Sequence, residues 1–393
     1  MDQLPELDDA LQDLSETLGC RIALIDEAGK VVAYSIHESP EDRRRLFHLL
    51  THSDSWPAPR TATAPYSLEE LPEVGTVLFI RLLDPQRHII GHLLLPAVAP
   101  GQEETPLSAP LSAALEATEQ LAELLGARQQ EEARRDARAN RLAVTLVSGA
   151  AGERESAAEH LLRERLLSSA AGYCAVALGV DPRAATALDN EKTSQAVART
   201  LQFVRETSTA TVVGGTLKNH LGVLVFPRPV VVPRLSRILS SPELSPVRAG
   251  VGSLSTLSEI HRSFQRAQLA WRASWLAPAD HGIVAAWEQV GLDGTLARMP
   301  VEDFTLDDLP PSARELLAAV DSPDLLDTLT AYLDTGGDAQ RTALNLHIHR
   351  STLYYRLDKL RAALSGDLHD GVFRRELHTG LRIARLAGLV PGR

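Results

Sequence analysis

The chain has 393 residues, of which 44% are hydrophobic and 23% charged, with a net charge of −11, a composition typical of a folded protein of two or three domains. Its two cysteines, Cys20 and Cys174, lie too far apart in the sequence for a disulfide framework or a zinc motif. The acidic start lacks a signal-peptide core and no apolar run approaches the roughly 18 residues of a membrane span, so we expect a cytoplasmic protein without a membrane partner.

Residues 1–105 have the pattern of a small sensor domain. The expected elements are a helix at 7–18, strands at 21–26 and 30–35, a helix at 41–51, and strands at 76–82 and 88–95. Gly29 suits the positive φ of the first hairpin turn. This order of strand pair, helix and strand pair resembles a PAS or GAF sensor domain. The region has five histidines: His37, His48, His52, His88 and His92. Their spacing matches no closed set of metal or haem ligands, so we expect neither a metal nor a cofactor.

A helical connector is expected over 106–165, after a Pro-rich linker at 96–110. The stretch 112–148 has no Pro and is crowded with Ala, Glu, Gln and Arg, which favours a long helix. One face carries an apolar seam at alternating steps of four and three: Leu111, Leu115, Thr118, Ala122 and Leu125. The seam suits pairing with a second subunit, or packing on the neighbouring domain of the same chain. The mixed-charge run 128–141 is expected to be a solvated face.

Residues 166–290 are predicted to form an α+β domain. The expected strands are 173–180, 210–214, 221–226 and 247–251, and the expected helices are 190–206 and 257–276. The second helix carries an apolar stripe that we expect in the core: Ile260, Phe264, Ala267, Trp271 and Trp275.

The predicted α+β domain is similar to a degenerate GGDEF-like domain over about 172–285. The similarity rests on Val247-Arg248-Ala249-Gly250-Val251-Gly252 followed by a helix with Ser263-Phe264-Gln265-Arg266-Ala267. The nucleotidyl cyclases of that class hold phosphates and metal ions with a Gly-Gly turn and acidic residues, which are missing after Gly214-Gly215. The chain also lacks a complete dinucleotide fingerprint, a Walker motif, HExxH and GxSxG. We therefore expect no enzyme activity, no metal and no cofactor.

After a linker at 291–320, residues 321–393 are predicted to form a helix-turn-helix domain. Ser322 and Pro323 begin a first helix that Gly336-Gly337 ends, and Asp338 caps a second. The chain turns at 347–349 before a third helix from Arg350. That helix has one apolar face, made of Leu353, Leu357, Leu360 and Leu364.

Charge places any DNA contact at this end of the chain. Segment 338–385 has nine basic and five acidic residues, a net +4, whereas residues 1–337 have 30 basic and 46 acidic ones, a net −16. Because phosphates repel the acidic part, DNA contact is confined to the basic end. We expect Arg350, Thr352 and Tyr355 to read bases, and Arg341, His349, Ser351 and Arg356 to hold phosphates. The alternative is an ordinary three-helix unit that binds another protein.

The same end of the chain resembles the C-terminal helix-turn-helix of PucR/CdaR-type bacterial transcription regulators. The resemblance covers about 316–389 and is carried by 326–334, Gly336-Gly337 and His347-Ile348-His349-Arg350-Ser351-Thr352-Leu353-Tyr354-Tyr355-Arg356-Leu357. It implies a sequence-specific regulator of double-stranded DNA that responds to an unknown small-molecule effector. One recognition helix reads too few base pairs to select a genomic site, so we expect a homodimer or higher homo-oligomer on an inverted-repeat operator.

The predicted fold class is therefore multidomain α+β. It comprises a PAS/GAF-like N-terminal α/β sensor domain, a helical connector, a GGDEF-like α+β domain and a C-terminal all-α helix-turn-helix.

Overall fold

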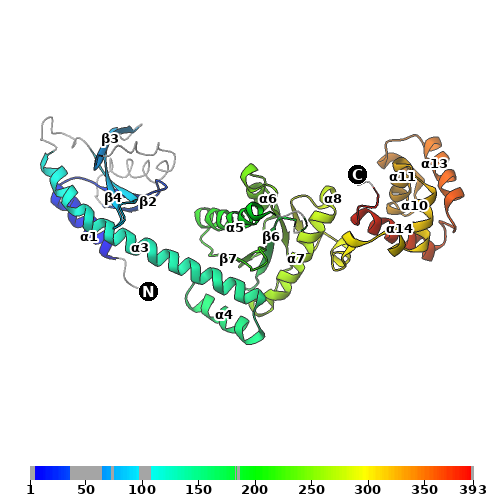
Figure 1. Ribbon diagram of the computed structural model, residues 1–393, viewed down its shortest axis with the longest axis horizontal. Coiled ribbons are helices and arrows are strands. Elements are labelled where there is room, and N and C mark those ends of the chain that lie inside the picture. The colour runs from blue at the N-terminus through cyan, green and yellow to red at the C-terminus, as the bar shows by residue number, and fades with distance from the viewer. Residues whose placement is uncertain are drawn as a thin grey trace. The chain divides into compact units, whose positions relative to one another are not determined.

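The computed structural model describes residues 5–35, 64–71, 75–96, 108–181, 183 and 186–390. The chain divides into two compact units, Met1–Ala137 and Arg138–Arg393. The first holds an antiparallel sheet with two helices, and the second holds a mixed sheet between helices followed by a helical domain (Figure 1). The expected multidomain α+β class with a helical C-terminal end is confirmed at this level.

The N-terminal sheet has the strand order β2-β1-β5-β4-β3. Its strands are β1 Ala23–Asp26, β2 Val31–Tyr34, β3 Tyr66–Leu71, β4 Gly75–Leu83 and β5 Ile89–Pro96. The two predicted strand pairs are confirmed, and Gly29 has the expected positive φ of 79°. The sequence patterns did not indicate β3, an edge strand that contains Glu69 and Glu70. The helix expected at 41–51 lies outside the described residues.

One face of this sheet is covered by α1 Pro5–Leu18 and by the N-terminal part of α3 Ser108–Ser148. Leu7 and Leu11 of α1 are buried with Leu93 of β5. The expected seam of α3 lies in the same cluster: Ala122 and Leu125 are buried there, and Leu111 and Leu115 pack against it. Of the two alternatives for the seam, these contacts favour packing on the chain's own domain.

Two of the five N-terminal histidines, His88 and His92, fall in the described part. His88 is exposed and its Nδ1 lies 3.1 Å from Asp84 Oδ2. His92 is buried beside the ring of Phe79, and burial, together with the nearby charge of Arg81, lowers its pKa. Their environments therefore differ, and within the described ranges no group of three or more His, Cys, Asp or Glu side chains suits a metal ion.

The second sheet has the strand order β10-β9-β6-β8-β7. Its strands are β6 Cys174–Gly179, β7 Val213–Thr216, β8 Gly222–Phe226, β9 Arg248–Val251 and β10 Val284–Ala286. Strand β6 pairs antiparallel with β8 and β9, whereas β10 pairs parallel with β9. The four predicted strands and both predicted helices, now α5 Ala187–Thr207 and α7 Ile260–Leu276, are confirmed with shifted ends.

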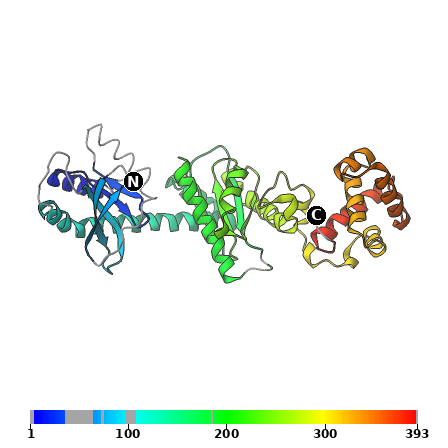
Figure 2. The same cartoon turned by 90° about the horizontal axis from the view of Figure 1, so that it is seen from above.

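Helices cover both faces of this sheet (Figure 1; Figure 2). On one face, residues 139–148 of α3, α4 Ala151–Arg163 and α7 share a core with Ala175 and Val223. On the other, α5 and α6 Val232–Leu239 share a core with Val176 and Leu224. The predicted α7 stripe is buried as far as Ala267, and Trp271 is half-buried with its Nε1 donating to Gly179 O at 3.0 Å. Trp275 lies under the Arg248 guanidinium, 4.7 Å from the ring centroid.

Two glycines let α7 lie directly on β9. A Cβ at Gly250 would stand 2.0 Å from Ala267 O and 2.2 Å from Trp271 N. A Cβ at Gly252 would stand 2.0 Å from Ser263 O. Because these neighbours are backbone atoms of a helix, no side-chain rotation can make room. Glycine is therefore required at both ends of Gly250-Val251-Gly252 because α7 packs directly against the backbone there.

The residues expected to form a linker, 291–320, hold α9 Leu292–Leu296, the 3-10 turns η4 Val301–Asp303 and η5 Leu306–Asp308, and α10 Pro311–Ala319. Ala313 and Leu316 of α10 are buried in the core of the C-terminal helical domain. Helix α10 therefore belongs structurally to that domain, which begins at about Leu309.

The rest of the helical domain comprises α11 Pro323–Asp334, α12 Ala339–Asn345, α13 Arg350–Ala363 and α14 Gly371–Leu386. Their shared core includes Leu329, Leu357 and Leu377, each fully buried. The three predicted helices of the helix-turn-helix and the closing helix are confirmed. Among the described helices, none has the length and apolar character that a bilayer crossing requires.

The close approach of α7 to β9 predicts that Gly250→Ala strongly destabilises the α+β domain. The added methyl meets two backbone atoms, so we expect a loss of about 3 kcal/mol or more. Calorimetry should show a lower unfolding temperature for the transition of this domain. The control is Gly152→Ala in α4, where a Cβ meets nothing within 4 Å and helix propensity predicts a gain of about 0.5–1 kcal/mol. Equal unfolding temperatures for Gly250→Ala and the wild type would contradict the packing argument.

Candidate DNA-binding site

The helix-turn-helix is built by sharp turns at fixed residues. Helix α11 ends at Asp334 and is followed by Gly336 and Gly337, whose φ values of 71° and 90° suit glycine. The turn before α13 places His347 at φ 53°, a left-handed conformation that residues other than glycine adopt less often. A buried hydrogen bond of 2.7 Å between the hydroxyls of Thr335 and Thr342 joins the end of α11 to α12. These contacts fix the direction in which α13 leaves the turn.

The buried side of α13 orients its outer side. Leu353, Leu357 and Leu360 are fully buried, as their spacing predicts, and Leu364 is half-buried. Consequently the opposite face points to solvent. Its exposed residues are Arg350, Ser351, Thr352, Tyr354, Tyr355, Asp358, Lys359 and Arg361.

The N-terminus of α13 is capped differently from those of its neighbours. Asp338 Oδ1 accepts hydrogen bonds from two amides of α12, and Asp370 Oδ1 does the same for α14. At α13 the cap is His349, whose Nδ1 accepts from the Ser351 amide at 3.3 Å and lies 2.8 Å from the Ser351 hydroxyl. Accepting a hydrogen bond at Nδ1 requires that this nitrogen carry no proton. A cap that is not a carboxylate leaves this helix end open to an approaching anion, whereas the two carboxylate caps repel one.

Aromatic side chains dominate the middle of the outer face. Tyr355 is 61% exposed and Tyr354 is 44% exposed. The Lys359 ammonium lies 4.7 Å from the centroid of the Tyr355 ring, a cation–π contact that restrains both side chains. Arg361 is paired with Asp358 at 2.9 Å, one turn further along. Two cations of α13 form no ion pair with a carboxylate within the described ranges: Arg350 at its first residue and Lys359 beside Tyr355.

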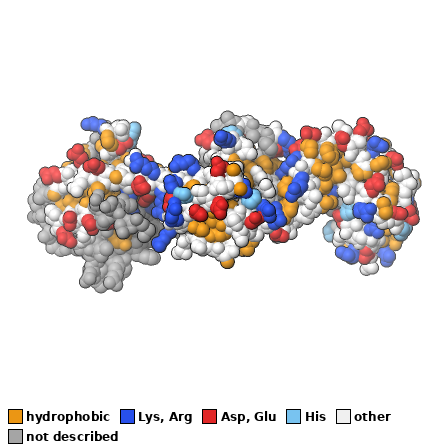
Figure 3. All heavy atoms as spheres, turned by 90° about the horizontal axis from the view of Figure 1, so that it is seen from below, with side chains coloured by type: hydrophobic (Ala, Val, Ile, Leu, Met, Phe, Trp, Pro, Cys, Tyr) orange, Lys and Arg blue, Asp and Glu red, His pale blue; other side chains and the backbone are white. Residues whose placement is uncertain are grey.

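The arginines of α12, α13 and α14 fall into two groups. Four arginines form ion pairs within the chain: Arg356, Arg361, Arg382 and Arg385. Four others form no ion pair or side-chain hydrogen bond within the part of the chain that the structure describes: Arg341, Arg350, Arg374 and Arg375. The second group lies on α12, the first residue of α13 and the first turn of α14. On the face of this domain that Figure 3 shows, acidic and basic side chains are interspersed, so the positive region is local.

The expected site residues mostly lie together on one surface. Arg350, Thr352 and Tyr355 are exposed on the first turns of α13, and Arg341 is exposed on α12. His349 and Ser351 are exposed as well, but their side chains contact each other in the cap.

Arg356 is placed differently from the expectation that it holds phosphate. Its guanidinium turns toward α11, where Nη1 donates to Thr328 Oγ1 and Nη2 to Asp324 Oδ2, both at 3.1 Å. The Arg356 side chain is only 22% exposed. It therefore ties the recognition helix to α11. No local sequence signal indicates the pair with Asp324, because its members lie 32 residues apart.

Comparison with known proteins points to the same residues. Residues 325–383 match the family profile of the PucR C-terminal helix-turn-helix domain. The purine catabolism regulatory protein of Bacillus subtilis is 38% identical over 93 residues, which is 23% of this chain and 17% of that protein. The chain thus aligns with much less than two thirds of this relative.

A solved structure is also similar by comparison of folds. The regulator of polyketide synthase expression from Bifidobacterium adolescentis aligns over 64% of this chain and 98% of its own, with 19% identity. The TM-score is 0.27, too low for this likeness to bear on the fold. The sequence matches support a PucR-type helix-turn-helix at the C-terminal end, over the residues whose geometry forms the candidate site.

Proposed function

We propose that this chain is a sequence-specific DNA-binding transcription regulator of the PucR type. The observation that carries the proposal is the outer face of α13, where polar and aromatic side chains are exposed. Arg350 on this helix and Arg341 on α12 form no ion pair within the described ranges. A helix of this kind fits the major groove, where hydrogen-bonding side chains distinguish base pairs. The family match over residues 325–383 supports the same function.

Within this function the residues have distinct roles. Arg350, Thr352 and Tyr355 read base edges, because they occupy the first turns of the recognition helix. Arg341, His349 and Ser351 hold phosphates at the rim. Nδ1 of His349 caps the helix, which leaves Nε2 to donate a hydrogen bond to a phosphate oxygen. We assign Arg356 a positioning role through α11 in place of a phosphate contact.

The remaining domains support regulation. The N-terminal unit, a five-stranded antiparallel sheet with helices on one face, fits a PAS/GAF-like sensor for a small-molecule effector. The second sheet, with a helix close on its Gly-Val-Gly strand, fits a GGDEF-like domain without catalytic residues. The purine role printed for the Bacillus subtilis relative belongs to that protein. The alignment covers 17% of it and leaves the regulated pathway open.

The DNA partner is expected to be an inverted-repeat operator bound by a homodimer or higher oligomer. A single recognition helix contacts only a few base pairs, while a genome offers about 10⁶ or more competing sites. Two-fold symmetry doubles the information that is read. A symmetric operator would place two recognition helices about 34–36 Å apart, or a multiple of that distance.

A scaffold function competes with DNA binding at the same surface. A scaffold protein would use the outer face of α13 to bind another protein, and Tyr354 and Tyr355 suit such a contact as well. The steep salt dependence of DNA affinity distinguishes the two functions, because it reports the counterions that leave the phosphates on binding.

A nucleotidyl cyclase would need an open Gly-Gly turn in the α+β domain, but the glycines of this domain have a different physical cause. Gly214 and Gly215 lie within β7. A Cβ on Gly214 would stand 2.6 Å from Leu224 Cδ2, and one on Gly215 would stand 2.9 Å from the backbone oxygen of Asn140 in α3. At Gly250 and Gly252 the backbone of α7 fills the same space. In each case the missing side chain lets a helix or strand approach, so packing accounts for these glycines.

The first prediction concerns sequence-specific binding. Genomic fragments selected by the full-length protein should share an inverted repeat. Replacing Arg350, Thr352 and Tyr355 together with Ala should abolish the shared motif, because the base-reading groups are gone. Arg350→Ala alone should cost about 1–3 kcal/mol and relax the preference at one base pair. Equal operator affinity for the triple variant and the wild type would exclude this assignment.

The second prediction distinguishes the positioning role of Arg356 from the DNA-contacting role of Arg350. Arg356→Gln should destabilise the helical domain by about 1 kcal/mol, because it removes contacts to Thr328 and Asp324. It should leave the slope of log affinity against log salt unchanged. Arg350→Gln is the matched control, which should weaken DNA binding while leaving thermal unfolding unchanged. A slope lowered by about one unit in Arg356→Gln would instead restore a phosphate contact.

The third prediction concerns the α+β domain. Purified protein incubated with GTP or ATP and Mg²⁺ should form no cyclic dinucleotide, because no carboxylate pair follows Gly214 and Gly215 in the sequence to bind the metal. Chromatography of the mixture checks this. Product above background that disappears in Gly214→Val would favour the cyclase function.

A further inference from the structure

A buried ion network joins the α+β domain to the helical domain. Arg382 of α14 donates from Nε to Asp293 Oδ1 at 2.8 Å, and its Nη2 bonds to Asp293 Oδ2 and, at 2.7 Å, to Asp280 Oδ2. His281 Nε2 lies 2.7 Å from Asp293 Oδ2. Asp280 and His281 belong to α8 Pro278–His281, and Asp293 to α9. The bidentate pair therefore spans 89 residues of sequence.

The inner carboxylate, that of Asp293, depends on this network for its charge. Asp293 is 5% exposed. Burial alone would raise its pKa, but hydrogen bonds from Arg382 and His281 outweigh burial and lower the pKa to about 2. Hydrogen bonding to Asp293 also raises the pKa of Arg382. A buried charge that loses its partner is strongly destabilising, so Asp293 keeps Arg382 in place.

Apolar contacts surround the ion network. Ala277, Leu296, Val301 and Leu386 are buried in one cluster, with Leu276, Phe304 and Ile383 packed against it. This cluster combines the end of α7 and residues 296–304, which follow the second sheet, with residues of α14. We call this contact region between the α+β domain and α14 the joint. It is held together by apolar burial as well as by charge.

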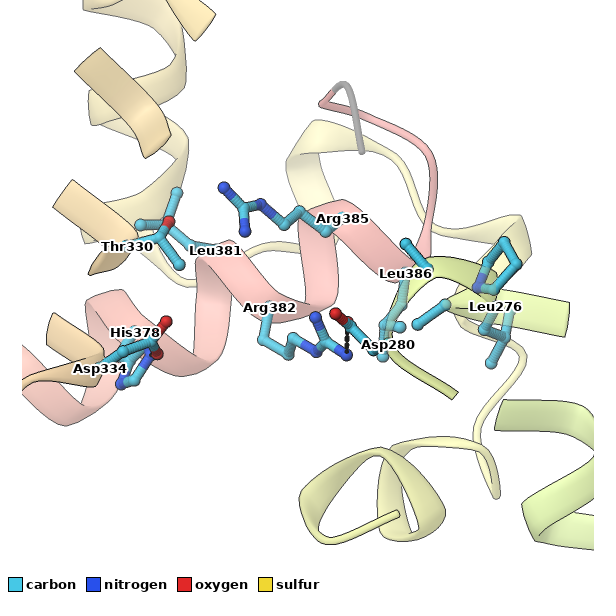
Figure 4. Close-up of a pocket in the computed structure, with 12 residues that line it drawn as sticks. Leu276, Asp280, Thr330, Asp334, His378, Leu381, Arg382, Arg385 and Leu386 are labelled. Carbon is cyan, nitrogen blue, oxygen red and sulfur yellow. Dashed lines mark hydrogen bonds and ion pairs between the residues drawn. The ribbon is translucent and has the colours of Figure 1, made fainter. Parts of the chain in front are cut away.

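The outer side of the joint borders a cavity of about 370 Å³ between α8, α11 and α14 (Figure 4). Arg382 points toward Asp280 at its wall, as the dashed line in Figure 4 marks. The Asp280 side chain is 51% exposed, whereas that of Asp293 is 7% exposed. The two carboxylates that share Arg382 thus differ sharply in their access to water.

Further contacts link α14 to the recognition helix. Arg385 Nη2 donates to Asp327 Oδ1 of α11 at 2.6 Å. Helix α11 in turn holds Arg356 of α13 through Thr328 and Asp324. A continuous series of contacts, along α14 and α11, therefore runs from Asp293 to α13.

We propose that Arg382 and Asp293 are positioning residues that fix the recognition helix relative to the α+β domain. This inference rests on the proposed function for its biological meaning, but its physical content is separate. Any movement of the α+β domain would be passed to α13, because residues at both ends of the joint are held by burial and by charge. Asp280 contributes little, since its carboxylate keeps its water.

The test measures the distance between the two domains in the full-length chain. Spin labels are attached at Gln195→Cys on α5 and Ala362→Cys on α13, both exposed positions, in a Cys20→Ser background. Cys174 is buried, and burial raises its pKa to about 11, so it does not take the label. Diluted into an excess of unlabelled chain, so that distances within one chain are measured, the otherwise unsubstituted chain should give one narrow distance distribution.

Asp293→Asn should broaden that distribution, and Asp280→Asn should leave it narrow. If Asp293→Asn fails to fold, Arg382→Lys replaces it. Arg382→Lys keeps the charge but loses the bidentate fork, so it should also broaden the distribution. The matched control is Arg375→Gln, which removes an unpaired cation from the same helix and should leave the distribution narrow.

Unchanged distributions in both Asp293→Asn and Arg382→Lys would overturn the inference, and so would equal broadening by Asp280→Asn. Fragment selection with the same variants connects the joint to DNA. A freed recognition helix should accept several half-site spacings where the wild type accepts one. If the wild type selects no DNA while Asp293→Asn still broadens the distances, the proposed function fails and the joint stands.

Discussion

The bidentate contact between Arg382 and Asp293 is the interaction on which the arrangement of the C-terminal half depends. Helix α14 belongs to two cores at once: Leu377 and Leu381 are buried with the helical domain, whereas Leu386 is buried in the joint. Asp293 has lost nearly all contact with water, so its charge requires the guanidinium. A helix held on both sides cannot rotate without breaking one of the cores. The direction of α13 follows from that constraint.

In the helical domain, ion pairing with carboxylates of the same chain determines which arginines contribute positive charge to the surface. The arginines that hold structure, such as Arg356 and Arg385, face carboxylates of the same chain and add little to the outer field. By contrast, Arg341 and Arg350 face no such partner in the described ranges. A chain with a net charge of −11 can thus present a positive surface to phosphates at one end. The imidazole cap of His349 adds to this, because a carboxylate at the same position would oppose an anion.

Local sequence signals were sufficient to locate the helices that carry strong periodicity or caps. The apolar steps of α7 and α13 and the cap at Asp338 identify these elements, because each signal lies within one or two turns of helix. The family resemblance at 316–389 indicated a DNA-binding function for α13. The sequence patterns did not indicate the edge strand β3, because Glu69 and Glu70 are disfavoured in strands. They did not indicate β10 either, because its three residues take their structure from the neighbouring strand.

Only the tertiary structure shows which charged residues lie on the outer surface and which lie in the joint between the domains. Arg350 and Arg356 look alike in the sequence, yet one is unpaired and the other is bound to α11. Residues 291–320 have the pattern of a linker, but α10 packs in the helical core and Asp293 anchors α14. These outcomes depend on pairs 32 to 89 residues apart. Local periodicity carries no information about such pairs, because they are selected by burial and by the cost of leaving a charge unpaired.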